Sequence, residues 1–278
     1  MNRSKIEIDD DAAPGFSGRK QGGSLTNFVT GLDWFDPILP SGVPVPSSIL
    51  ISGPSGTGKP FVGLAIAGSW LKQGGRVIFI PIHAAYQSLY ESGLKSLHDL
   101  SLDEYPGSHF FILLDSELEQ REEAVEVAGG NAIRCNLLNP KVWEEALAVA
   151  SASMEADGPI LVFASALNVL LMSPSYGEQF FMMLLDTIRN TGEWTYLLAI
   201  SSSILKKKII VLEQAADHLF LMQQVARGRQ LQVRAARVRG APFHVEPVLL
   251  PRQVGLIKQM KEEAVASRRI LIPTVSKV

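Results

Sequence analysis

Residues 53–60, with the sequence G-P-S-G-T-G-K-P, limit the choice of fold more than any other part of this chain. They agree with the phosphate-binding loop pattern G-x-x-x-x-G-K-[ST], the P-loop, at every position except the last. The glycines of such a loop let the backbone turn tightly and aim its N–H groups at phosphate oxygens, and the lysine reaches the β- and γ-phosphates. Contacts with a nucleotide are therefore predicted for Gly53, Ser55, Gly56, Thr57, Gly58, Lys59, Pro60 and Phe61.

The segments on either side favour a P-loop over a chance glycine-rich turn. Residues 48–52 form a short apolar run that predicts a strand, and residues 61–71 are small and apolar, which predicts a buried helix. A strand, a glycine-rich turn and a helix, in this order, are the context that a P-loop requires. A proline in the first turn of the helix is compatible with this arrangement.

Pro60 stands where the pattern has serine or threonine. The hydroxyl of that residue binds Mg²⁺ in P-loop enzymes, and proline has neither a hydroxyl nor a backbone N–H. This one position therefore removes a metal ligand and one donor of the phosphate cradle. We expect ATP or another nucleotide to bind weakly or without metal, and the sequence assigns no metal ligand.

Composition narrows the class of protein. The chain has 278 residues, 46% of them hydrophobic, which suffices for one large domain with a sizeable core. The net charge of −2 gives no overall basic field toward nucleic acid or anionic membranes. Cys135 is the single cysteine, which excludes an internal disulfide and a cysteine-based zinc site and fits a cytoplasmic location; we expect a buried or half-buried thiol rather than a reactive one. The longest apolar run, residues 159–172, is too short to span a membrane.

Strands alternate with helices along the chain, which predicts an α/β fold with a mostly parallel twisted sheet, helices on both faces and late antiparallel strands. We expect a disordered polar tail (1–24), one domain (25–250) and a C-terminal tail with helical character (251–278). The predicted strands are 48–52, 76–80, 109–114, 160–163, 195–201, 218–222, 231–238 and 243–249, and the predicted helices are 61–71, 85–97, 140–155, 178–190 and 209–214. The acidic segment 115–126 is expected to be a solvated helix face or a loop.

The order of motifs resembles the KaiC/RadA-like branch of the RecA-superfamily P-loop ATPases, over residues 30–248. The resemblance rests on the P-loop and on four further segments. These are T-G-L-D-W-F-D-P-I-L-P-S-G-V-P (30–44), G-G-R-V-I-F-I (74–80), A-D-H-L-F-L (216–221) and R-V-R-G (237–240). It implies a RecA-like fold that binds ATP or another nucleotide.

The departures from that family fall on its catalytic positions. His83 and Ala84 align with a pair of glutamates that polarise the attacking water, and Ala164 aligns with the aspartate that holds Mg²⁺. Together with Pro60, these degenerate positions leave no residue to which catalysis can be assigned. The resemblance thus implies a pseudo-ATPase. His83 acting as a substitute base is the less favoured reading, because such a base would lack a metal-bound phosphate to serve.

The resemblance also implies an oligomeric ring, formed with copies of the chain or with an active paralogue. Arg237 and Arg239 match basic residues that reach into a neighbouring subunit's nucleotide; an ordinary exposed basic turn is the alternative. Two other functions stay open. An atypical active ATPase could recruit Asp115 or Glu117, and a RadA-like nucleic-acid-binding ring could use the basic runs 206–208 and 227–229 in predicted loops. Nucleic acid is not favoured, because no aromatic residues interleave with the basic ones.

Overall fold

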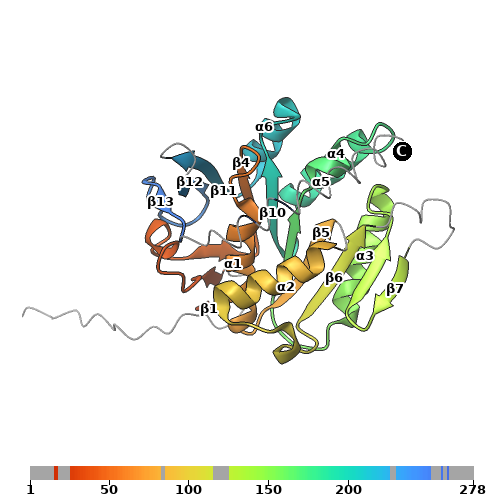
Figure 1. The fold of residues 1–278 in the computed structure, drawn as a ribbon. Coiled ribbons are helices and arrows are strands. Elements are labelled where there is room, and N and C mark those ends of the chain that lie inside the picture. The colour runs from red at the N-terminus through yellow and green to blue at the C-terminus, as the bar shows by residue number, and fades with distance from the viewer. Residues whose placement is uncertain are drawn as a thin grey trace, which may run out of the picture.

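The computed structural model describes residues 16–17, 26–82, 85–114, 125–225, 230–251, 258 and 262. A ten-stranded sheet with the order β13-β12-β11-β4-β10-β9-β5-β6-β8-β7 forms its centre (Figure 1). The inner strands run parallel: β4 (Ser48–Gly53), β5 (Arg76–Ile82), β6 (His109–Leu114), β8 (Ala132–Cys135), β9 (Ile160–Ser165), β10 (Thr195–Ser201) and β11 (His218–Val225). The strands at the two ends are antiparallel to their neighbours: β7 (Val125–Gly129), β12 (Gln230–Val238) and β13 (Val248–Leu249).

Helices cover both faces of this sheet, because each strand alternates between two apolar faces. The face with Ile51, Phe79 and Phe163 packs against α1 (Lys59–Lys72) and α2 (Ala85–His98). The opposite face packs against α3 (Pro140–Ser153), α4 (Asn168–Leu171), α5 (Gly177–Arg189) and α6 (Lys206–Ala215). The chain also forms a small sheet of β1 (Phe16–Ser17), β2 (Thr26–Phe28) and β3 (Val43–Val45), and the 3-10 turns Asp36–Ile38 and Leu102–Glu104.

Helix α1 is almost wholly buried, which explains its run of small and apolar residues. Gly63 on this helix faces β9, where a Cβ atom would lie 2.2 Å from the Phe163 ring. A glycine is therefore needed for the helix to lie close against the sheet. This contact fixes the helix that begins at the P-loop.

The predicted α/β class, with a mostly parallel sheet and late antiparallel strands, is confirmed. The strands predicted at 109–114 and 195–201 have those bounds in the structure, and the other predicted helices and inner strands differ from it by a few residues. Cys135 is buried, as expected. No helix among the described residues has the length and apolar character needed to cross a membrane.

Two local predictions were wrong. Residues 206–208 belong to the first turn of α6 and not to a loop, because Lys208 pairs with Glu178 at 2.7 Å and lies over the Phe181 ring of α5. The strand predicted at 243–249 is reduced to β13, since Pro247 lacks the N–H that a ladder needs. Within the segment expected to be a disordered polar tail, residues 16–17 form β1, which pairs with β2.

The β7–β8 hairpin was not predicted. Its two-residue turn is Gly130-Asn131, a pair that is typical of tight hairpins and could have signalled it. Because the residues before it are acidic, the sequence instead predicts a solvated helix face or a loop at 115–126. Residues 83, 84, 115–124, 226–229 and most of the C-terminal tail lie outside the described residues, and the predictions made for them stay untested.

Candidate functional site

The P-loop sits at the carboxyl end of β4 and continues into α1. Gly53, Gly56 and Gly58 all have positive φ angles, of 153°, 78° and 73°. At Gly53 a Cβ atom would lie 2.3 Å from the carbonyl oxygen of Met222, so the loop can pass β11 only with glycine there. The tip of the loop, from Pro54 to Gly56, is exposed, which leaves one side of it open to a ligand.

The ammonium group of Lys59 lies inside the loop. Only 6% of this residue is exposed. Its Nζ donates to the carbonyl oxygens of Gly53 (3.0 Å) and Pro54 (2.7 Å) and lies 3.3 Å from the hydroxyl of Thr57. These acceptors compensate for the loss of water around a buried charge. The loop is therefore built around a positive centre.

Phe61, the last predicted nucleotide contact, packs in the core and bonds within its own helix. Its ring is fully buried, and its N–H donates to the carbonyl oxygen of Gly58 at 3.0 Å. Pro60 occupies the first turn of α1 and offers no N–H. The N–H groups that the loop can offer to an anion therefore come from positions before Pro60.

A serine cluster, made of Ser55, Ser201 and Ser203, joins the loop to the end of β10. The N–H of Ser55 donates to Oγ of Ser203 at 2.9 Å, and the hydroxyls of Ser55 and Ser201 lie 2.9 Å apart. The N–H of Ser203 points at Oγ of Ser201 at 3.3 Å. No role was predicted for the serine run 201–203, although its place after a predicted parallel strand could have indicated one.

The serine cluster rests on a rigid support. The buried amide of Asn168, on α4, donates to the carbonyl oxygen of Ser201 at 2.9 Å and accepts from its N–H at 2.7 Å. Both backbone groups of Ser201 are thus held by one side chain. A paired, buried amide of this kind restricts movement of the strand end.

The neighbouring strand β9 ends without a carboxylate. Ala164 is fully buried within the apolar face of α3–α6, and Ser165 is 1% exposed. The hydroxyl of Ser165 lies 2.5 Å from that of Tyr90, a fully buried residue whose ring stacks on Phe163. The polar group at this strand end is therefore paired with another hydroxyl.

The described residues do not fit Mg²⁺ beside the loop. Mg²⁺ is held by carboxylate oxygens together with phosphate oxygens and water, and Pro60 and Ala164 supply no ligand. Within the described ranges, no group of three His, Cys, Asp or Glu side chains is arranged to hold a metal. His83, Ala84, Asp115 and Glu117 fall outside these ranges.

Glu213 on α6 supports the strand that leads into the loop. Oγ of the fully buried Ser52 donates to Oε1 of Glu213 at 2.5 Å. Because α6 covers the face of the sheet opposite to α1, this carboxylate lies across β4 from the P-loop helix. Its function in the structure is to hold the residue before Gly53.

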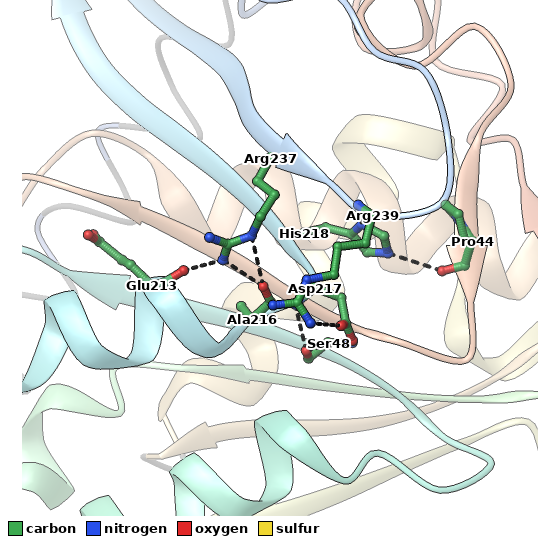
Figure 2. A network of polar contacts seen from close by, with 8 residues as sticks. All are labelled: Pro44, Ser48, Glu213, Ala216, Asp217, His218, Arg237 and Arg239. Atoms are coloured by element: carbon green, nitrogen blue, oxygen red, sulfur yellow. Dashed lines mark hydrogen bonds and ion pairs between the residues drawn. The ribbon is translucent and has the colours of Figure 1, made fainter.

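Arg237 and Arg239 both contact their own chain (Figure 2). The half-buried guanidinium of Arg237 donates to the carbonyl oxygens of Ala216, at 2.6 Å from Nη2, and of Glu213, at the end of α6. Burial, together with the charge of Arg239, lowers the pKa of Arg237. Arg239 is more exposed and pairs with Asp217 at 3.1 Å. Asp217 in turn accepts from the N–H and the hydroxyl of Ser48.

His218 lies beneath this turn and is 1% exposed. Its Nδ1 accepts from the N–H of Arg239 at 3.3 Å, so its Nε2 carries the proton and donates to the carbonyl oxygen of Pro44 at 3.2 Å. Burial lowers the pKa of His218. The neutral ring therefore ties the arginine turn to the segment before the P-loop strand (Figure 2).

A P-loop between a central parallel strand and a buried helix, in a mostly parallel sheet with late antiparallel strands, defines a RecA-like P-loop fold. Among solved structures, the chain is similar to the KaiC-like protein PH0186 of the hyperthermophilic archaeon Pyrococcus horikoshii OT3. The match has a TM-score of 0.57 and 13% sequence identity, and it covers 82% of this chain and 100% of that one. No protein-family model matches the sequence, and no curated protein is similar to it.

Proposed function

We propose that this chain is a RecA-like pseudo-ATPase that binds the phosphates of ATP or another nucleotide without Mg²⁺ and acts through assembly. One observation carries the proposal: the loop keeps its glycines and its central Lys59, while the positions that would hold the metal are Pro60 and Ala164. The anion site is thus retained beside a strand end that supplies no carboxylate.

The missing groups cost more free energy in the transition state of hydrolysis than in nucleotide binding. Phosphoryl transfer depends mainly on positioning and on charge neutralisation, for which Mg²⁺ is the main cation. Each loss of about 1.4 kcal/mol from transition-state stabilisation lowers the rate about tenfold. Binding loses less, because one missing charge-assisted hydrogen bond costs roughly 1.5–3 kcal/mol. Weak binding therefore survives changes that remove efficient hydrolysis.

Calorimetric titration of ATP in Mg²⁺ and in excess EDTA tests the proposal. We expect similar, weak affinity under both conditions and phosphate release at background level. Turnover of about one per minute or faster in Mg²⁺ would contradict the pseudo-ATPase. Pro60→Thr alone restoring strong hydrolysis would instead favour an active, atypical ATPase. Glu213 is not a candidate acid for that enzyme, because α6 places its carboxylate on the face of the sheet opposite to the P-loop helix.

Exposed apolar side chains support the assembly part of the proposal. On and beside α6, Ile204, Ile210 and Val211 are 40%, 50% and 36% exposed. Arg239 is the arginine more accessible to a neighbouring subunit, since its side chain is 56% exposed and held by an ion pair with Asp217. Arg237 instead closes its own helix end. Light scattering of the full chain, with and without ATP, should give a mass above that of one 30.3 kDa chain.

A nucleic-acid-binding ring remains the second candidate. Lys206 and Lys207 are exposed in the first turn of α6, where they add positive charge to a helix N-terminus. Salt-dependent retention on single-stranded DNA, lost in Lys206→Ala/Lys207→Ala, would favour it. If the wild type and the double variant are retained equally, these lysines do not bind the DNA.

A further inference from the structure

We propose that Ser203 is a specificity-determining latch that disfavours nucleoside triphosphates relative to diphosphates. The inference rests on the proposed nucleotide binding at the P-loop and deepens it. In the structure, the Ser203 hydroxyl accepts the N–H of Ser55 at 2.9 Å, from a segment outside the loop. A ligand oxygen that needs this N–H must first displace the hydroxyl.

The position of Ser55 within the loop indicates which phosphate competes. In a P-loop the backbone N–H groups cradle the α- and β-phosphates at the N-terminus of the following helix, and the lysine reaches the β- and γ-phosphates. Ser55 lies four residues before Lys59, on the side of the loop that contacts the end of β10 rather than α1. In the proposed complex, this N–H is the donor that the terminal phosphate of a triphosphate would use, because it lies farther from the helix than the loop N–H groups that follow it. A diphosphate bound at the helix end leaves the contact with Ser203 intact.

The latch is held in place by contacts that do not involve the ligand. The N–H of Ser203 lies 3.3 Å from Oγ of Ser201, and the Asn168 amide binds both backbone groups of Ser201. The hydroxyl of Ser203 thus meets the loop from an exposed turn that is tied to the end of β10 through Ser201. Opening the latch breaks a hydrogen bond whose net contribution corresponds to about a 2- to 10-fold change in affinity.

The test compares ATP and ADP affinities, measured by calorimetry in EDTA, for the full-length wild type and three variants. Ser203→Ala should lower the ratio of the ATP to the ADP dissociation constant by about 2- to 10-fold, through tighter ATP binding alone. Ser203→Thr keeps the hydroxyl and should retain the wild-type ratio. Ser202→Ala is the matched control, since the described contact of Ser202 with the loop is its backbone N–H on the carbonyl oxygen of Gly53.

The outcomes separate this inference from the proposed function. If the wild type binds neither nucleotide, both the proposed function and the inference about Ser203 are wrong. If the wild type binds but Ser203→Ala leaves the ratio unchanged, or weakens ATP binding, only the latch is overturned. An equal change for ATP and ADP would mean that Ser203 merely shapes the loop, which also overturns it.

Discussion

The ammonium group of Lys59 can donate to either of two sets of acceptors, one in the loop itself and one on a bound phosphate. Without a ligand its ammonium is satisfied by the carbonyl oxygens of Gly53 and Pro54. A phosphate offers the same group a charged acceptor, which makes a stronger hydrogen bond than a neutral carbonyl does. The contribution of Lys59 to nucleotide binding is therefore the difference between a charged acceptor and a neutral one.

Replacing this lysine tests whether the loop is an anion site. Lys59→Met should weaken ATP binding roughly 10- to 150-fold, because a hydrogen bond to a charged group contributes about 1.5–3 kcal/mol. Calorimetry measures the change. The exposed Lys141 at the start of α3 provides the control, and Lys141→Met should bind ATP as the wild type does. Equal affinities for wild type and Lys59→Met would place the nucleotide elsewhere.

At the next level, the loop depends on how α1 lies against the sheet. Gly63→Ala should lower the free energy of unfolding by about 1–3 kcal/mol, since the added methyl would meet the Phe163 ring in a filled core. Urea denaturation measures this loss. Gly130→Ala, in the β7–β8 turn, is the control and should cost much less, because an added Cβ there would have no atom within 4 Å. A loss no larger than that of the control would show that the helix can move away from β9.

The end of α6 depends on Arg237 more than on its neighbour. Arg237→Ala should lower the free energy of unfolding by about 1.5–3 kcal/mol, because losing a half-buried guanidinium leaves the last carbonyl oxygens of the helix unpaired. Arg239→Ala removes an exposed ion pair and should cost about 0–1 kcal/mol. Thermal or urea unfolding of the two variants ranks them, and the reverse order would refute this division of roles.

For the molecule as a whole, the buried His109 and His218 and the half-buried His98 join segments that are separate in the sequence. His98 links α2 to α1 through the carbonyl oxygen of Ala65, and His109 lies between Tyr105 and Asn131 at the start of β6. His218 joins the arginine turn to Pro44. Burial lowers the pKa of all three rings. Folding therefore favours the neutral form of these rings over the charged one.

This predicts a stability that falls with acidification. Below about pH 6.5, the ordinary histidine pKa, these histidines bind protons in the unfolded chain but stay largely neutral in the folded chain. Stability is thus complete above that pH and is lost as the pH falls toward the lowered pKa values, by up to about 1.4 kcal/mol per pH unit for each ring. Urea denaturation between pH 7.5 and 5.5 measures the slope. His218→Gln should reduce it and His244→Gln, at an exposed position, should not; a flat profile for the wild type would disprove the linkage.

Several features followed from short stretches of sequence. The glycines of the P-loop, the apolar strand before it and the small-residue helix after it are neighbours along the chain, so their pattern alone indicated the turn that they form. The alternation of strands and helices indicated the parallel sheet for the same reason. Pro60 and Ala164 could be recognised as lacking metal ligands because side-chain chemistry does not depend on the fold.

The long-range contacts around the P-loop depend on the order of the strands in the sheet and could not be predicted from the sequence. Ser203 meets Ser55 across 148 positions, Glu213 meets Ser52 across 161, and Tyr90 meets Ser165 across 75. Local patterns carry no information about such pairs, because which strand ends lie side by side depends on the packing of the whole sheet. The sequence itself thus specified a glycine-rich P-loop turn, and tertiary packing determined which side chains contact it.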